Sequence, residues 1–236
     1  MTGAPLTLAV TSSTGVMSLA VGRDAAGAVS VVVPTERRHA EELSPQLQAI
    51  LAEAGHTLAD LERLAVDVGP GRFTGLRVGV ATVRALAFAL EVPVVGLSSL
   101  AILAAGQIRS TAGSDPVTAV IDARRAEVFQ RTFVGDRPTG PARVGPPSTL
   151  AVEAQGTVVG DGADRYREDY DAIGTLTVVE GGNPHAATML DLAGTDPGVP
   201  GTQVVPDYLR DPDAKPNIRT RPGVDGGQSA PAEATS

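Results

Sequence analysis

The residues best placed to do chemistry are three glycines that stand just before an apolar helical segment. Gly69, Gly71 and Gly75 lie in the run GPGRFTG. Backbone N–H groups of such a loop can point at an anion, where the dipole of the following helix favours negative charge. The spacing is one residue longer than in dinucleotide-binding loops, and the lysine of a P-loop is missing. Alternatively, the glycines are needed only because they can adopt positive φ angles and let the helix pack closely. Anion binding and a purely structural role therefore both stay open.

Carboxylates at the ends of predicted strands are a second group of candidates. Asp67, Asp122, Glu127 and Asp161 stand at or near such ends, where α/β enzymes keep functional carboxylates. The same residue type also stabilises turns by accepting backbone N–H bonds. We favour turn stabilisation as the simpler interpretation of these four residues.

Metal and nucleophilic chemistry have little support in the sequence. His39, His56 and His185 are isolated from one another, and none has a second histidine three or four residues away. The chain has no cysteine and no Gly-x-Ser-x-Gly motif. We therefore expect no catalytic residue, no protein metal site and no bound cofactor.

Composition limits the partners of the chain. Lys+Arg total 19 and Asp+Glu total 27, so the formal net charge is −8. This charge disfavours nonspecific electrostatic binding to nucleic acid or to an anionic membrane. Hydrophobic residues make up 42% of the chain, as in globular proteins. The first residues lack the basic start of a signal peptide, and no stretch approaches about 20 unbroken apolar residues. We expect a cytoplasmic protein without a membrane span.

The elements that must position the candidates alternate between strands and helices, which indicates α/β layering. The glycine loop connects a strand to a helix that is rich in alanine and valine. A proline, Pro45, lies inside the first predicted helix, which either kinks there or begins at Ser44. The predicted strands are 6–10, 16–21, 29–33, 64–68 and 92–96, and the predicted helices are 38–55, 74–90 and 98–108.

The second part of the chain repeats this plan at the level of pattern. Residues 117–133 again predict a strand, a polar turn and a strand, as in the first twenty-odd residues. Residues 211–236 carry too few large apolar side chains to order themselves. We therefore predict a half at 1–109, a second half at 110–210 and a disordered tail at 211–236. The further elements predicted in the second half are strands 157–160 and 175–179, helix 163–170 and a short helix after Pro184.

The helix predicted at 74–90 is apolar on two sides. One series of apolar residues at helical spacing, which includes Leu76, Val80 and Val83, should face the sheet. Ala81 and Phe88 lie on the other side, which is also largely apolar. A helix that is apolar all round is buried on both sides, so the second side predicts contact with another helix or a partner.

Several motifs resemble those of the TsaB family, the non-catalytic subunits of the bacterial machinery that makes threonylcarbamoyladenosine in tRNA. The resemblance covers nearly everything before residue 211. Its motifs are GPGRFTGLRVGVA from Gly69, VPVVGLSSL from Val92, HAEELSP from His39, IDARRAEV from Ile121, GDG from Gly160 and PDYLR from Pro206.

This resemblance implies a duplicated actin-like ATPase fold (ASKHA, ribonuclease H-like) with two α/β halves. It further implies a scaffold that pairs with a TsaD transferase, related to the TsaD/Gcp-like family, through helices 38–55 and 74–90. The modified base would be adenosine 37 of tRNAs that read codons beginning with A. A TsaE ATPase would join the pair, and ATP-dependent TsaC would supply threonylcarbamoyl-adenylate, so ATP would be used through partner subunits.

The resemblance assigns residues to two roles. The interface residues would be His39, Glu42, Leu43, Arg77, Ala81, Arg84, Ala85 and Phe88. Anion or nucleotide contacts between the halves would involve Ser12, Gly69, Gly71, Gly75, Asp122, Gly160 and Gly162.

The chain departs from the family pattern at one position that bears on catalysis. Thr11 follows the first strand where an aspartate is common, and the paired histidines with which TsaD-like enzymes hold a metal are missing. Both differences weigh against the alternative functions, an actin-like nucleotide hydrolase or a glycoprotease-like peptidase. A homodimer through the same apolar helix face is a further expectation.

Overall fold

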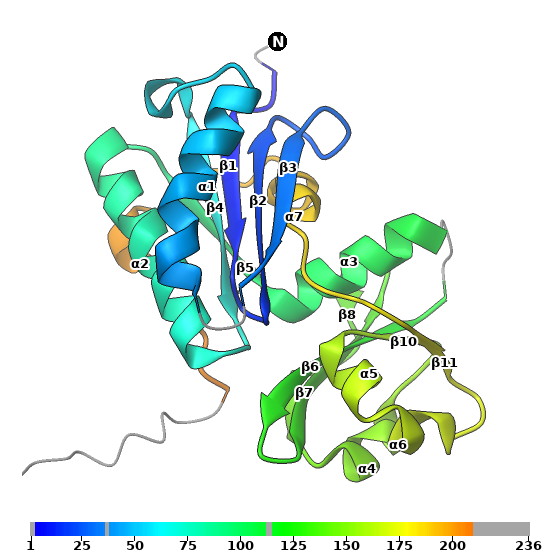
Figure 1. Cartoon of the computed structure of the whole chain (residues 1–236). Coiled ribbons are helices and arrows are strands. Elements are labelled where there is room, and N and C mark those ends of the chain that lie inside the picture. Colours follow the sequence, from blue (N-terminus) through cyan, green and yellow to red (C-terminus); the bar gives the residue numbers. More distant parts are fainter. Residues whose placement is uncertain (1–2, 36–37, 112–114, 210–236) are drawn as a thin grey trace, which may run out of the picture.

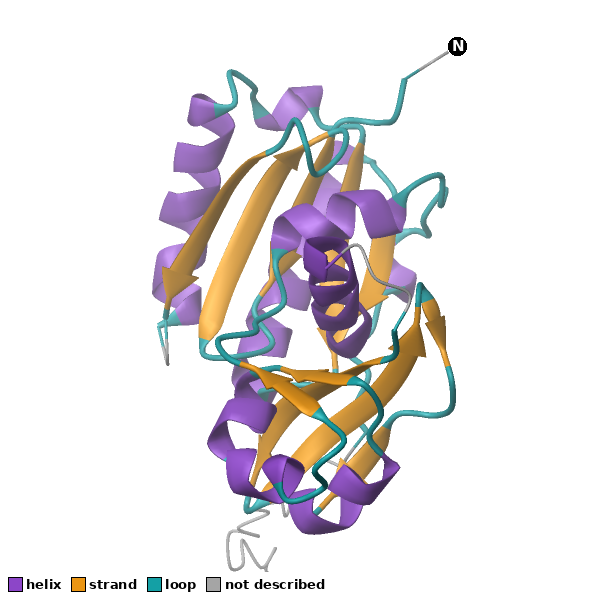
Figure 2. Cartoon of the chain, turned by 90° about the vertical axis from the view of Figure 1, so that its right-hand side faces the viewer, coloured by secondary structure: helices purple, strands orange, loops and turns teal. Residues whose placement is uncertain are grey.

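The computed structural model describes residues 3–35, 38–111 and 115–209, which form two α/β halves, each built on a mixed sheet (Figure 1). The tail predicted at 211–236 lies outside the described residues. Figure 2, turned by 90°, shows the two sheets one above the other with helices between them.

The first half is a five-stranded sheet with the order β3-β2-β1-β4-β5. β2 pairs antiparallel with β1 and β3, whereas β1, β4 and β5 run parallel. α1 and α2 cover one face, and α7 lies on the other (Figure 1). The bounds are β1 Thr7–Thr11, β2 Val16–Gly22, β3 Val29–Pro34, α1 His39–Glu53, η1 Leu58–Asp60, β4 Arg63–Gly69, α2 Phe73–Leu90, β5 Val94–Ser98, α3 Ser99–Thr111 and α7 Ala186–Ala193.

The second half repeats the topology of the first. The order β9-β7-β6-β10-β11, with β7 antiparallel to β6 and β9 and with β6, β10 and β11 parallel, matches β3-β2-β1-β4-β5 strand for strand. The duplicated actin-like fold is therefore confirmed. The bounds are β6 Val117–Arg124, β7 Glu127–Val134, β8 Arg137–Pro138, β9 Arg143–Gly145, α4 Pro147–Leu150, η2 Ala151–Glu153, β10 Thr157–Val159, α5 Asp161–Arg165, α6 Arg167–Asp171 and β11 Thr177–Val179. The last element, η3 Gly201–Gln203, packs on α2 of the first half.

The halves exchange their last helices. α3 follows β5 but packs on β6 and β7, where Leu100 and Leu103 join the core of the second half. α7 follows β11 but packs on β1 and β2, where Met189 contacts the first sheet. The buried Arg63 donates to the carbonyl oxygens of Gly194 at 3.0 Å and Asp196 at 2.9 Å, just beyond the end of α7. The structural halves are thus interleaved in sequence.

Two features of the helices answer questions that the sequence left open. α1 runs without a break from His39 through Pro45, so it does not begin at Ser44. α2 buries Leu76, Val80 and Val83 against the sheet, as predicted, and leaves its opposite side exposed.

One helix bears on the expectation that the chain has no membrane span. By length and mean hydropathy alone, α2 is the one candidate span among the described residues, with a third of the span buried. In the fold, however, α2 packs on β4 as an outer helix of a layered half. The arginines of α2 interrupt its apolar run, so this helix does not meet the criterion of an unbroken apolar stretch applied to the sequence.

Candidate functional site

The glycine loop docks the N-terminus of α2 onto the β1–β2 hairpin. A Cβ on Gly75 would overlap the carbonyl oxygen of Ser12, and one on Gly71 would overlap that of Ser13. The Ser12 hydroxyl donates to the Gly75 carbonyl at 2.9 Å, and the Arg72 N–H donates to the Ser13 carbonyl at 2.7 Å. This packing accounts for glycine at both positions without a ligand.

Gly69 has its own packing reason. Its φ is +110°, a region that favours glycine, and a Cβ there would lie 2.9 Å from the carbonyl oxygen of Asp207. Asp207 belongs to the C-terminal segment, and its N–H donates to the Val68 carbonyl at 2.7 Å. The loop therefore has a neighbour on each side, the hairpin and the C-terminal segment.

The second half uses glycine in the same way. Gly160 has a φ of +126°, and a Cβ on it would overlap the carbonyl oxygen of Val120. A Cβ on Gly162 would lie 2.8 Å from the carbonyl carbon of Ile121. These glycines bring the start of α5 against β6, as Gly75 brings α2 against β1. An anion or nucleotide contact at the glycines of either half stays a prediction.

Asp67 is a buried carboxylate at the end of β4. It accepts hydrogen bonds from the Thr11 hydroxyl at 2.6 Å, from the Gly69 N–H at 2.9 Å and from the Ser99 hydroxyl. Burial raises the pKa of Asp67, and these hydrogen bonds only partly oppose it. Asp67 thus joins β1, β4 and the start of α3, which agrees with the turn-stabilising interpretation. Thr11, where the family commonly has aspartate, is one of its donors.

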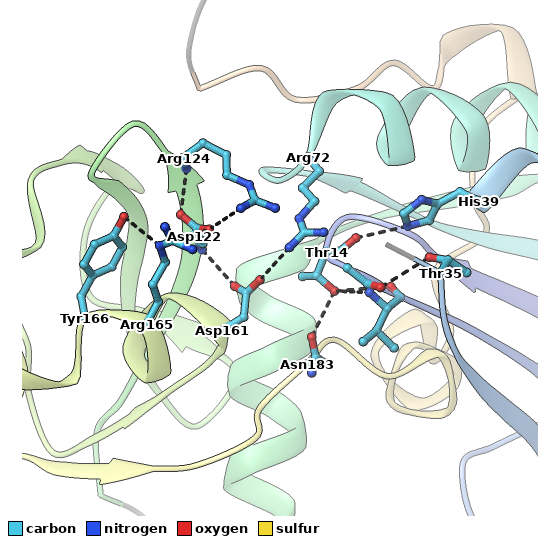
Figure 3. A network of polar contacts seen from close by, with 12 residues as sticks. Thr14, Thr35, His39, Arg72, Asp122, Arg124, Asp161, Arg165, Tyr166 and Asn183 are labelled. Atoms are coloured by element: carbon cyan, nitrogen blue, oxygen red, sulfur yellow. Dashed lines mark hydrogen bonds and ion pairs between the residues drawn. The ribbon is translucent and has the colours of Figure 1, made fainter. Parts of the chain in front are cut away.

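An open cleft of about 990 Å³ lies between the halves. Two polar contacts cross it, as Figure 3 shows. The Arg72 guanidinium, from the glycine loop, lies 3.9 Å from the carboxylate of Asp161 at the start of α5. The Thr14 hydroxyl, from the first hairpin, donates to the side-chain oxygen of Asn183 at 3.1 Å. The cleft is therefore held by side chains that are far apart in sequence.

The wall of the cleft on the second half holds two carboxylates within a set of arginines (Figure 3). Asp161 accepts the Asp122 N–H at 2.9 Å, and burial raises the pKa of Asp161. The buried Asp122 accepts the Arg124 N–H at 2.9 Å. The guanidinium groups of Arg124 and Arg165 lie 3.4 and 3.9 Å from the Asp122 carboxylate. Backbone N–H groups and arginine side chains of the chain itself thus surround the carboxylates of Asp122 and Asp161, two of the candidates from the sequence.

His39 lies inside the chain rather than on its surface. Its ring Nε2 donates to the Thr14 carbonyl at 3.2 Å, and only 3% of the residue is exposed. Burial, helped by the nearby Arg72, lowers the pKa of His39. Leu43, one turn later on α1, is also buried, while Glu42 is half-buried and lies 3.7 Å from Arg38. In the isolated chain, α1 therefore turns both His39 and Leu43 toward the first hairpin and core, and a contact of either residue with a partner stays a prediction.

The predicted interface residues on α2, by contrast, share one exposed face. Phe88 is 85% exposed, which is more than any other large apolar residue in the part of the chain that the structure describes. Ala85 and Ala81, on the two preceding turns of the same face, are exposed small residues. The exposed members of the predicted set are Arg77, Ala81, Arg84, Ala85 and Phe88.

The C-terminal segment extends this face, which the sequence interpretation missed. Tyr208 packs its ring 5.3 Å from that of Phe73, between centroids, and its hydroxyl accepts from Arg77 Nε at 3.2 Å. The Arg77 guanidinium lies 3.7 Å from the centre of the Phe73 ring. The only sequence signal was the PDYLR motif, which carried no interface assignment. Arg72, Arg124 and Asn183 of the cleft were missed too, because nothing local relates them.

The part of the chain that the structure describes contains no group of three or more His, Cys, Asp or Glu side chains placed to hold a metal ion. The site consists instead of the cleft and the exposed face of α2.

Comparisons with known proteins place the chain in a family. The family model described as "TsaD: tRNA N6-adenosine threonylcarbamoyltransferase" matches residues 30–136. An uncharacterized protein of Mycobacterium tuberculosis is 37% identical over 187 residues, which cover 76% of this chain and 79% of that protein. The tRNA threonylcarbamoyladenosine biosynthesis protein TsaB of Escherichia coli is 36% identical over 130 residues, or 55% of each chain.

A solved structure agrees with these matches over a larger part of the chain. YeaZ from Pseudomonas aeruginosa is 33% identical with a TM-score of 0.76, and the match covers 87% of this chain and all of that one. Together with the duplicated fold and the glycine loop, these matches show that the chain belongs to the TsaB (YeaZ) family.

Proposed function

We propose that the chain is a non-catalytic scaffold subunit in the biosynthesis of tRNA threonylcarbamoyladenosine. It pairs with a TsaD-like transferase and enables that enzyme to modify adenosine 37 in tRNAs that read codons beginning with A. The names of the TsaB relatives support the pathway. The observation that carries the pairing is the exposed apolar face of α2.

This face has the character of a helix-packing surface. Phe88 offers a large apolar side chain at 85% exposure, and Ala81 and Ala85 are small enough for another helix to approach closely. Interfaces concentrate aromatic and arginine side chains, and Arg77 and Arg84 lie on the same face. Exposure of such a face to water is unfavourable unless a partner covers it.

The match to the transferase family model supports the identity of the partner. Residues 30–136 include both α1 and α2, so a TsaD-like protein carries equivalent helices. Two related chains can then pair through equivalent surfaces about an approximate two-fold axis, as the two copies of a symmetric dimer do.

The chemistry in this proposal belongs to the partner. Asp67 and Asp122 are held by hydrogen bonds from their own chain, which supports structural roles for both. ATP is used by TsaC-like and TsaE-like proteins, and tRNA is bound through the complex in the cytoplasm.

Reconstitution tests the proposal directly. TsaC, TsaD and TsaE of the same organism are incubated with tRNA, threonine, bicarbonate and ATP, with and without the chain, and threonylcarbamoyladenosine is measured by mass spectrometry. Product that requires both TsaD and the chain is the expected result. Product without TsaD would make the chain itself the transferase, and product that does not depend on the chain would overturn the scaffold role.

A further inference from the structure

The exposed face of α2 continues into a groove. The groove has a volume of about 730 Å³ and lies between the C-terminal half of α2 and the segment 198–202. Ala85, Ala87 and Val199 contribute apolar surface to it, and Phe88, which is 85% exposed, lines it as well. Because this apolar surface faces water in the described part of the chain, a segment that covers it would gain free energy from burial.

The C-terminal segment leads the rest of the chain to this face. It packs on α2 through η3 and ends at the start of the helix, where Tyr208 contacts Phe73 and Arg77 (Figure 1). The tail, residues 211–236, follows almost at once and lies outside the described residues. Its 26 residues reach about 85 Å when extended, whereas the 18 residues of α2 span about 27 Å. The tail therefore starts beside the exposed face and is long enough to follow it to the groove.

The charges of the tail match those of the face in order. From the start of α2, the face carries two positive charges and then a negative one, each about 10 Å from the next. The tail begins DPDAKP, with two negative charges and then a positive one at every second residue, which puts them on one side of an extended chain. The long side chains of arginine and lysine span the difference in spacing. The charges of the face are Arg77, Arg84 and Glu91, and those of the tail are Asp211, Asp213 and Lys215.

The tail also supplies an apolar side chain for the groove. Its large apolar residues are Ile218 and Val224. Ile218 follows Lys215 by three residues, and Glu91 itself lines the groove, so Ile218 can reach the groove when Lys215 lies beside Glu91. Two large apolar side chains are too few to order the tail by itself, but an apolar surface provides the burial that the tail lacks.

We propose that residues 211–218 bind along the exposed face of α2 of the same chain. The contacts are two ion pairs and one apolar contact, namely Asp213 with Arg84, Lys215 with Glu91, and Ile218 in the groove. The bound tail covers part of the surface that the proposed function assigns to the transferase, so the transferase must displace it. This competition alone rests on the proposed function, whereas the binding of the tail does not.

Disulfide cross-linking tests the binding of the tail on the full chain, without any partner protein. The chain has no cysteine, so an introduced pair has no competing thiol. Ala85→Cys in the groove, combined with Asn217→Cys, should form an intramolecular disulfide, seen as a monomer of altered mobility on a non-reducing gel. In a mild oxidant this disulfide should form at least about tenfold faster than those of two control pairs, because the bound tail raises the effective concentration of one thiol at the other.

The control pairs move one cysteine at a time. Ala172→Cys with Asn217→Cys places the first cysteine at an exposed position next to α6. Ala85→Cys with Ala234→Cys places the second cysteine in the part of the tail that the proposal leaves unbound. A rate for Ala85→Cys with Asn217→Cys that equals those of the control pairs, or a disulfide that joins two copies of the chain, would overturn the proposal.

Charge reversal tests the register. In the chain with Ala85→Cys and Asn217→Cys, either Arg84→Asp or Asp213→Arg puts like charges together and should slow the cross-link by about threefold. The two reversals together should restore the rate, because opposite charges then meet again. Arg137→Asp makes the same charge change as Arg84→Asp at an exposed position in the second half and should leave the rate unchanged. A double reversal that stays slow would refute the pairing of Asp213 with Arg84.

The competition with the transferase is measured separately. Asp213→Arg in the otherwise unaltered chain should bind the TsaD-like transferase about threefold more tightly, because its tail leaves the face more readily. Cross-linking as described with an unchanged transferase affinity would retain the binding of the tail and overturn the competition. A chain that cross-links as described but neither binds the transferase nor supports tRNA modification would overturn the proposed function alone.

Discussion

The Ser12 hydroxyl donates a hydrogen bond to the Gly75 carbonyl at 2.9 Å, and the Ser12 carbonyl occupies the space where a Cβ on Gly75 would lie. The first hairpin and the start of α2 are therefore in backbone contact. The second half makes the equivalent contact between Gly162 and β6. These two contacts set the walls of the cleft, since Arg72 and Asp161 stand at the starts of the same two helices.

Gly75→Ala should destabilise the chain by about 1–3 kcal/mol in urea unfolding, because the added methyl group must push α2 away from Ser12. Alanine has the higher helix propensity, by about 1 kcal/mol, so the clash must outweigh a gain. Gly140→Ala is the control, because a Cβ added at Gly140 would have no atom within 4 Å. This variant should change the free energy of unfolding by less than about 0.5 kcal/mol. A Gly75→Ala variant as stable as the parent would refute the close docking.

Ala85→Arg should abolish pairing with the TsaD-like transferase on size-exclusion chromatography while the monomer stays folded. The residue is exposed in the isolated chain, so the larger side chain costs the monomer little, whereas a packed helix contact must bury its charge. Ala172→Arg, at an exposed position next to α6, should pair normally. Unchanged transferase binding by Ala85→Arg would remove this position from the interface.

His39 should contribute stability that rises with pH in the acid range. Its pKa is lowered from the ordinary value of 6.5, so below 6.5 the unfolded chain binds more protons at this residue than the folded chain. The contribution of the neutral histidine is complete above 6.5 and is lost as the pH falls toward its lowered folded pKa. Because the raised pKa values of Asp67 and Asp161 act in the opposite direction, the slope of His39 is measured as the difference in urea midpoints between the parent and a His39 variant from pH 5 to 8.

The control variant replaces the imidazole of His39 with a side chain that does not titrate but can still donate a hydrogen bond. His39→Gln can still donate to the Thr14 carbonyl and should flatten the acid slope. Equal slopes in the parent and His39→Gln would assign the pH dependence to other groups.

Arg63→Met should cost about 2–3 kcal/mol of unfolding free energy. The buried guanidinium donates to the carbonyl oxygens of Gly194 and Asp196, and its loss leaves them without that charged donor. Arg143→Met removes an exposed pair with Glu153 and should cost less than about 1 kcal/mol. Similar losses in both variants would argue against Arg63 as the residue that secures the end of α7.

The sequence by itself determined most elements of the first half, the duplication and the family. Apolar periodicity depends on neighbours within one or two turns, so the strands before the glycine loop and the buried side of α2 could be predicted from local pattern. The repeat of strand, turn and strand at 117–133 predicted a duplicated fold, and the topology of the two sheets confirms it. The second apolar side of α2 was also visible in the pattern, and it is exposed in the fold.

Only the tertiary structure decided which surfaces are covered. His39 and Leu43 are buried because the first hairpin and the core lie over that side of α1, and no local pattern carries this information. The glycines could be explained only once the hairpin was seen against them. The contacts between Arg72 and Asp161, and between Tyr208 and Phe73, join residues that are far apart in sequence. Spacing along a chain fixes local geometry, whereas long-range packing selects the neighbours.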